Sequence, residues 1–226
     1  MSEAREQILS RLRQAREGLP DAPPRPAQYQ PVMTVEDESP QGLLSRFRTE
    51  LEGLQGEVYL VGDEEAALDK TLSLLAESGA RHALTWDWSH IPLPGLDRAL
   101  ANAGIEALQP TPDNREACEA AEAGISGADA AIAATGSLVV STAAGMGRLA
   151  TLLPPQHIVL LRQEQLLPCL EDWVALQRAE ELTGLGSRSN LCIITGPSRT
   201  ADIEKNLVLG VHGPGLLQVV VVEQAS

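Results

Sequence analysis

Short apolar segments alternate with amphipathic segments along the middle of this chain, and this alternation restricts its fold more than any other feature. We expect strands at residues 57–61, 81–86 and 105–108, separated by helices at residues 63–78 and 95–103. Strands joined by helices of that length lie parallel, and helices then cover both faces of the sheet. The pattern therefore predicts an α/β fold with a mostly parallel sheet.

The second half of the chain continues with apolar segments, but its helices are more widely spaced. A short helix is expected after residue 112, and a longer one between the strands at residues 157–161 and 191–195. The expected elements are helices at residues 113–123 and 170–182 and strands at residues 129–134, 138–141, 157–161, 191–195 and 216–222.

The N-terminal segment is predicted to be a helix of its own. Over residues 2–17, a stripe of Ile8, Leu12, Ala15 and Leu19 recurs at spacings of four, three and four residues, and five prolines follow within residues 20–31. An isolated helix of this length is marginally stable in water, so the stripe should bury against another subunit or partner, or else against the chain's own body. We expect a domain boundary between residues 34 and 35. Residues 1–34 form a helical arm and a linker, and residues 35–226 form an α/β domain.

A second helix is predicted to begin at Ser39, as N-cap, with Pro40 in the first turn. Leu43, Phe47 and Leu51 then share one face, which should pack on the domain.

Charge and composition exclude several classes of function. Seventeen Lys and Arg against 31 Asp and Glu give a net charge of −14, and aromatic residues make up only 3%. Such a field repels nucleic acid and anionic membranes, and bases would find few rings to stack on. Three scattered cysteines without a Cys-x-x-Cys pair predict no disulfide framework and no metal site, and no segment has the length of a membrane span. A cytoplasmic protein is expected.

The densest group of glycine and hydroxyl residues directly follows the strand expected at 191–195. It reads Gly196-Pro197-Ser198-Arg199-Thr200, continues to Asp202 and Glu204, and is predicted to open a helix. Free backbone N–H groups at a helix start, two hydroxyls and one guanidinium favour a small anion. The alternative is purely structural: Thr200 caps the helix and Arg199 pairs with a surface carboxylate.

Two further segments carry candidate residues. His212 lies in a glycine-rich loop with Gly213 and Pro214, where small neighbours allow a ligand to approach, whereas His82 and His157 are interpreted as packed or surface residues. The third segment contains Thr135, Gly136 and Ser137 and, further on, Arg148. No nucleotide-binding glycine motif or nucleophile elbow is present.

Together, the segments ADAAIAATGSLVVST, GRLATLLPPQHIVLL and ITGPSRTADIEKNLVLGVHGPGLLQVVVVE closely resemble the lactate utilization protein C family, also called the LUD domain. The resemblance covers roughly residues 35–225. It implies a three-layer α/β/α sandwich like that of sugar-phosphate isomerases and coenzyme A transferases. It also implies a role in oxidising L-lactate to pyruvate with iron–sulfur partner proteins, a cysteine-rich one and a larger one. Two departures are Ala134, where relatives often carry a polar residue, and Met146, which interrupts the glycine loop.

Three functional hypotheses follow. The first is a component of a lactate-oxidising system that binds a small anionic ligand, with Arg148 or Arg199 holding the carboxylate and Asp202 and His212 as candidate catalytic residues. The second is an assembly subunit without chemistry, and the third an isomerase or coenzyme A transferase that uses Glu204 or Asp202. The sequence contains no iron–sulfur, flavin or nicotinamide motif, so the cofactor is unknown and the electron acceptor should come from a partner.

Overall fold

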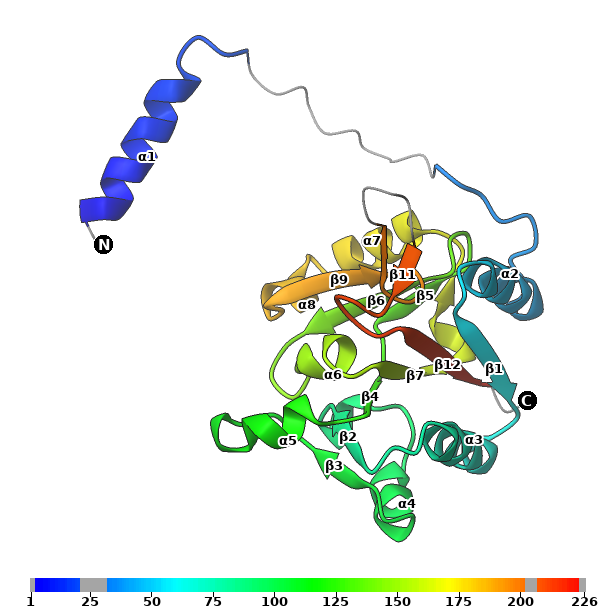
Figure 1. The fold of residues 1–226 in the computed structure, drawn as a ribbon. Coiled ribbons are helices and arrows are strands. Elements are labelled where there is room, and N and C mark those ends of the chain that lie inside the picture. The colour runs from blue at the N-terminus through cyan, green and yellow to red at the C-terminus, as the bar shows by residue number, and fades with distance from the viewer. Residues whose placement is uncertain (1–2, 21–31, 202–206, 224–226) are drawn as a thin grey trace. The chain divides into compact units, whose positions relative to one another are not determined.

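The computed structural model describes residues 3–20, 32–201 and 207–223, and the chain forms two compact units, residues 1–30 and 31–226 (Figure 1). The first unit contains the helix α1 (Glu3–Arg16), which confirms the helix predicted there. Its apolar residues Ile8, Leu12 and Leu19 are exposed. The proline-rich connector lies mostly outside the described residues.

The second unit is built on a six-stranded sheet in which every neighbouring pair is parallel. This confirms the α/β class and the mostly parallel sheet. In spatial order, the strands are β1 (Glu57–Val61), β12 (Leu216–Val222), β7 (Gln156–Arg162), β4 (Ala123–Ser126), β2 (His82–Thr85) and β3 (Glu106–Leu108).

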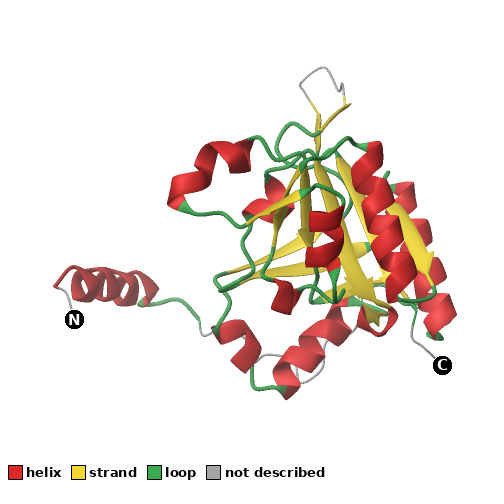
Figure 2. Cartoon of the chain, turned by 90° about the horizontal axis from the view of Figure 1, so that it is seen from below, coloured by secondary structure: helices red, strands yellow, loops and turns green. Residues whose placement is uncertain are grey.

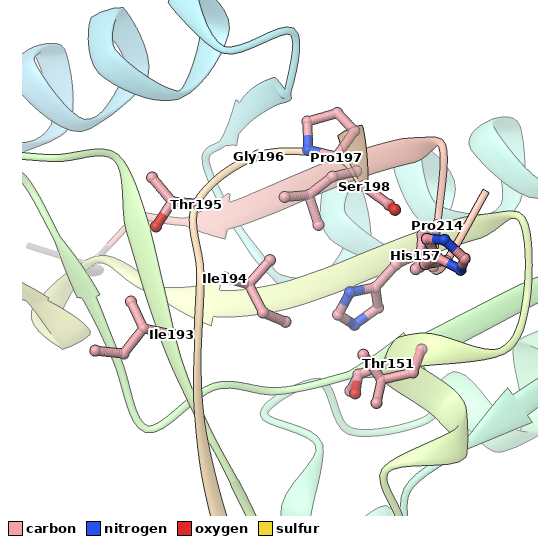
Figure 3. Close-up of a pocket in the computed structure, with 13 residues that line it drawn as sticks. Thr151, His157, Ile193, Ile194, Thr195, Gly196, Pro197, Ser198 and Pro214 are labelled. Carbon is pink, nitrogen blue, oxygen red and sulfur yellow. The ribbon is translucent and has the colours of Figure 1, made fainter. Parts of the chain in front are cut away.

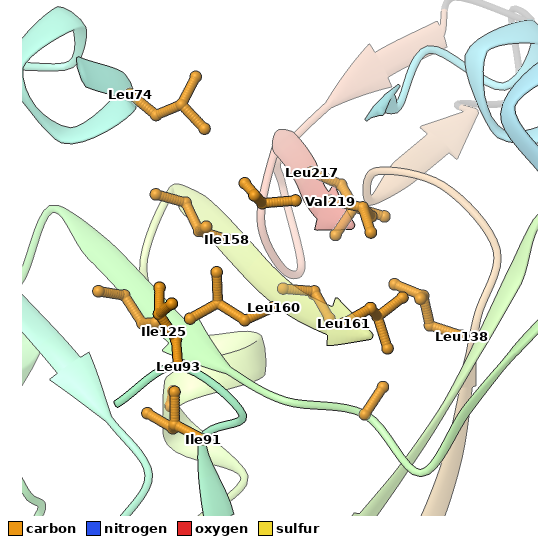
Figure 4. Packing of buried hydrophobic residues seen from close by; sticks show 14 of the residues in the cluster. Leu74, Ile91, Leu93, Ile125, Leu138, Ile158, Leu160, Leu161, Leu217 and Val219 are labelled. Atoms are coloured by element: carbon orange, nitrogen blue, oxygen red, sulfur yellow. The ribbon is translucent and has the colours of Figure 1, made fainter. Parts of the chain in front are cut away.

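The two faces of this sheet are covered differently. Helix α3 (Glu64–Glu77) packs on one face, where Gln156 of β7 donates from Nε2 to the Leu74 carbonyl at 3.2 Å. Helix α6 (Leu149–Leu152) packs on β4, where Gly124 has no side chain and the Ala150 carbonyl takes its place. Side chains along a strand point alternately to the two faces, so Ile158 and Leu160 share the face that α3 covers (Figure 4). His157 and Leu161 hold the alternate positions of β7 and face the other side.

A second, four-stranded sheet is found in the same unit, with β6 antiparallel to both its neighbours. Strand β6 is buried on both faces: Leu138 and Val140 join the main core, and Val139 packs with Trp173. Figure 2 shows the strands gathered in the middle of this unit, with most of the helices around them. The strands are β8 (Leu166–Leu167), β5 (Ala130–Ile132), β6 (Ser137–Thr142) and β9 (Asn190–Ile194), and Trp173 belongs to α7 (Leu170–Ala179).

The helix predicted at Ser39 is present as α2 (Pro40–Gly53). The Ser39 hydroxyl accepts a hydrogen bond from the Gly42 N–H at 3.1 Å, as an N-cap does. Phe47 and Leu51 are fully buried. The remaining elements are α4 (Leu96–Asn102), α5 (Arg115–Glu119), α8 (Thr183–Gly186), the 3₁₀ turns η1 (Trp88–His90), η2 (Pro112–Asn114) and η3 (Gln163–Gln165), and strands β10 (Arg199–Ala201) and β11 (Leu207–Leu209).

Three expectations about individual elements were wrong. Strand β4 was not predicted, because Ala-Gly-Ile-Ser carries little apolar signal, and the helix expected over residues 113–123 is reduced to η2 and α5. The strand expected at 191–195 is, by contrast, present as β9, and it belongs to the second sheet. The helix expected after Gly196 is absent over Arg199–Ala201, which pairs with β11 as a hairpin instead.

No helix in the described part of the chain is both long and apolar enough to cross a membrane.

Candidate functional site

Two of the three predicted segments meet, in part, at a pocket of about 220 Å³ (Figure 3). One wall is the turn after β9, and a second is the loop before β12. The floor comes from α6 and the first residues of β7 and β12. The lining residues are Thr151, Leu152, His157, Ile193, Ile194, Thr195, Gly196, Pro197, Ser198, His212, Gly213, Pro214 and Leu217.

Backbone hydrogen bonds hold the two walls together. The Ser198 N–H donates to the Pro214 carbonyl at 2.8 Å, and the Gly210 N–H donates to the Ser198 carbonyl at 2.9 Å. Gly196 has φ +94 and Gly210 has φ +77, a left-handed conformation that glycine adopts at little cost. The glycine-rich composition of both segments is thus explained by the close approach of two loops.

The Thr135–Ser137 turn lies behind the pocket rather than in its lining. The Ser137 hydroxyl is 2.8 Å from the Thr135 hydroxyl and 2.8 Å from that of Thr195, so a chain of hydroxyls leads to a lining residue. Gly136 serves packing, because a Cβ there would lie 2.5 Å from the backbone nitrogen of Leu51 in α2.

The arginines expected to hold a carboxylate lie elsewhere. Arg148 is the exposed N-cap residue of α6, and Arg199 is exposed on β10; neither lines the pocket. Thr200 is paired with Val208 in the β10–β11 hairpin. Asp202 and Glu204 lie outside the described residues.

His157 also lines the pocket, although its place beside an apolar strand had predicted a packed or surface residue. It is only 1% exposed, and its Nε2 lies 2.9 Å from Ser126 Oγ, whose own hydroxyl donates to the Gly127 carbonyl. Because the Ser126 proton is used on the Gly127 carbonyl, we place the histidine proton on Nε2, which leaves Nδ1 as an acceptor. Among the described residues, Nδ1 has no hydrogen-bond partner. A polar residue within the otherwise apolar segment that follows Gln156 was the available signal.

Burial sets the protonation state of this histidine. Because burial disfavours the charged imidazolium, the pKa of His157 falls from 6.5 to about 3. The ring is therefore neutral at physiological pH. The pocket combines this neutral acceptor with the hydroxyls of Thr151, Thr195 and Ser198 and with the exposed His212. Such a set suits a small ligand that carries both hydrogen-bond donors and acceptors.

No group of three or more His, Cys, Asp or Glu side chains is arranged to hold a metal ion within residues 3–20, 32–201 and 207–223. The three cysteines are free thiols. Cys118 and Cys169 are buried, and Cys192 is partly exposed on β9. Burial raises the pKa of the Cys169 thiol, as do Asp172 and Glu171 nearby.

The fold and the pocket define a class: an α/β protein with a small hydroxyl-lined site at the amino ends of two central parallel strands. The LUD domain model matches residues 44–222, and the chain belongs to this family. Lactate utilization protein C of Halalkalibacterium halodurans is 34% identical over 161 residues, which are 70% of this chain and 69% of that protein. Lactate utilization protein C of an Exiguobacterium species is 32% identical over 228 residues, 96% of this chain and 95% of that protein.

A solved structure shares the fold. The crystal structure of a DUF162 family protein from Deinococcus radiodurans superposes with a TM-score of 0.59 at 23% identity, covering 82% of this chain and 99% of that one.

Proposed function

We propose that the protein is a component of a lactate utilization system and binds a small 2-hydroxycarboxylate such as L-lactate in the pocket that contains His157. The family membership and the names of the relatives support the lactate utilization role. The unpartnered Nδ1 of His157 carries the assignment of the ligand, because a buried acceptor without a partner favours a ligand that brings a donor.

Each polar group of the ligand has a complement in this proposal. The 2-hydroxyl donates to His157 Nδ1, and the carboxylate accepts from the hydroxyls of Thr195 and Ser198 at the mouth of the pocket. With a pKa of about 3, His157 orients the hydroxyl and is a weak proton acceptor at neutral pH. Oxidation to pyruvate releases two electrons, which iron–sulfur partner proteins would accept, and two protons, which would pass to the solvent.

The test compares L-lactate with propionate, which has the same carbon skeleton but no hydroxyl. Calorimetry should show lactate binding at least about tenfold more tightly to the wild-type protein, because the missing hydroxyl leaves Nδ1 unpaired. The variant His157→Phe should bind the two acids equally. His82→Gln, on the far side of β4, is the matched control and should keep the preference for lactate.

Equal affinity of the wild-type protein for both acids, or a preference for lactate retained in His157→Phe, would refute the assignment. If His157→Phe does not fold, Thr195→Val and Ser198→Ala provide the second measurement. Each should weaken lactate binding without abolishing the preference over propionate, since they contact the carboxylate that both acids share.

A second candidate function is assembly without chemistry. The observation that favours it is the apolar stripe formed by Ile8 and Leu12 of α1 and by Leu19 just after it, each at least 60% exposed. A helix of this composition is stabilised by burying that stripe, either on an iron–sulfur partner or on a second copy of the chain. Wild-type activity in the reconstituted system by a His157→Phe variant would favour this candidate over ligand binding.

A further inference from the structure

A second crevice lies at the carboxyl ends of the central parallel strands, whereas the pocket with His157 lies at their amino ends. Strand β3 pairs with one side of β2, and the next strand, β4, pairs with the other side, so the strand order reverses between β2 and β4. In open parallel sheets, ligands bind outside the carboxyl ends of the two strands at such a reversal. Trp86 directly follows β2, and Ala128 and Asp129 follow β4; all three line this crevice.

The crevice has a volume of about 350 Å³, larger than that of the first pocket. Half of its lining residues are apolar and half are polar, so it offers both an apolar surface and groups that can orient a ligand, as small-molecule sites do. The lining residues are Trp86, His90, Ala128, Asp129, Ala143, Met146, Ser187 and Arg188.

Two glycines, Gly127 and Gly145, leave the space that His90 of the turn η1 occupies beside the crevice. A Cβ on Gly145 would lie 2.9 Å from the His90 ring, and a Cβ on Gly127 would lie 2.9 Å from the His90 carbonyl. The Asp87 N–H donates to the Gly145 carbonyl at 2.7 Å, which fixes this turn. The Trp86 indole N–H donates to the Gly147 carbonyl at 3.2 Å, so the ring on the floor of the crevice is also fixed.

Arg188 supplies the charge of the crevice. Its Nη2 lies 3.3 Å from Asp129 Oδ1, while the other oxygen of that carboxylate, Oδ2, accepts from the Ser141 backbone N–H and hydroxyl. The second terminal nitrogen, Nη1, contacts the Met146 sulfur at 3.3 Å, which is a weak acceptor. A guanidinium in this position is oriented by Asp129, and within the described part of the chain its Nη1 contacts only the weak acceptor Met146 Sδ.

We propose that this crevice is a second ligand site, which takes a monocarboxylate with a short apolar body. The carboxylate replaces the Met146 sulfur as the acceptor for Arg188 Nη1, and the body packs on Trp86, Ala128 and Ala143. A guanidinium binds a carboxylate with strong, charge-assisted hydrogen bonds. Inorganic phosphate fits this crevice poorly. Its charge is larger than a single arginine, already paired with Asp129, can offset, and it has no apolar part to pack against Trp86, Ala128 and Ala143.

The test uses 4-methylpentanoate, a monocarboxylate with a branched body and no hydroxyl. The protein has three tryptophans, so ¹⁵N-labelled protein gives three indole N–H signals, and a Trp86→Phe variant identifies that of Trp86. We expect this signal to shift on titration to about 20 mM, since one charge-assisted contact with partial burial supports a millimolar Kd. The uncharged 4-methylpentanamide and inorganic phosphate should leave it unchanged.

Two variants of crevice residues and one surface control test whether the ligand binds in this crevice. Arg188→Gln should weaken binding at least about tenfold, whereas Arg98→Gln, which removes the same charge from exposed α4, should leave it as in the wild type. Ser187→Phe fills the exposed mouth of the crevice without removing Arg188 and should also abolish the shift.

A Trp86 signal that does not move with the carboxylate, or moves equally in Arg188→Gln, would overturn the proposal. So would equal shifts with the amide. The measurement does not depend on the first pocket, because His157→Phe should leave the Trp86 titration unchanged whether or not that variant still prefers lactate.

Discussion

The buried neutral histidine should make the folded protein sensitive to mild acid. In the unfolded chain His157 has the ordinary histidine pKa of 6.5, and in the folded protein its pKa is about 3. Between these values, the unfolded chain binds a proton that the folded protein does not. The free energy of unfolding therefore falls as the pH drops below 6.5, and it stops falling on this account only near pH 3. From pH 7 to pH 5, the loss from this single group amounts to about 2 kcal/mol.

Replacing His157 with phenylalanine removes this contribution and keeps a ring in the same space. Urea denaturation at pH 7 and pH 5 measures the loss of stability for each protein. The loss should be about 2 kcal/mol smaller in His157→Phe than in the wild type. The exposed His90 provides the control, and His90→Gln should lose as much stability as the wild type. Equal losses in the wild type and His157→Phe would show that His157 is protonated in the folded protein, and the neutral acceptor would have to be abandoned.

Two further outcomes are expected. Gly124→Ala should destabilise the domain by about 3 kcal/mol or more in urea denaturation, because the new Cβ would collide with the Ala150 carbonyl; Gly147→Ala, whose Cβ would meet nothing within 4 Å, should change stability by less than about 1 kcal/mol, and similar values for the two would contradict this packing. Deleting residues 1–30 should reduce the number of chains per assembly measured by sedimentation or abolish co-purification with partner proteins, because the stripe of Ile8, Leu12 and Leu19 is then lost. An unchanged number of chains together with unchanged co-purification would exclude docking between chains.

The central sheet was largely predictable because its strands carry a strong local signal. Residues 57–61 and 216–222 were placed to the residue, since apolar runs bounded by turn residues leave little choice. Strand β4 failed for a physical reason. It is short, and Gly124 is required by a helix that packs directly on the backbone, so the residue that makes the strand fit also removes its apolar signature.

The candidate site was predictable in its loops and not in its floor. Gly196–Ser198 and His212–Pro214 are marked by glycine, proline and hydroxyl residues, and the structure brings them together. His157 lies far before both loops in the sequence and within an apolar segment. The local pattern marks it only as a polar residue among apolar ones, because its hydrogen bond is made with Ser126 of the unpredicted strand β4. The order of strands, which sets the position of the second crevice, is likewise a long-range property.

The pairing of β12 has a consequence for how the chain acquires its structure during synthesis. Residues 216–222 lie between β1 and β7, so an interior position of the central sheet is filled by the last of its six strands to be translated. Until these residues leave the ribosome, β1 has no partner and one edge of β7 remains open, and long-range parallel pairings of this kind form slowly. The nascent protein therefore exposes two unpaired apolar strand edges late in translation, which is the period in which it most needs protection from aggregation.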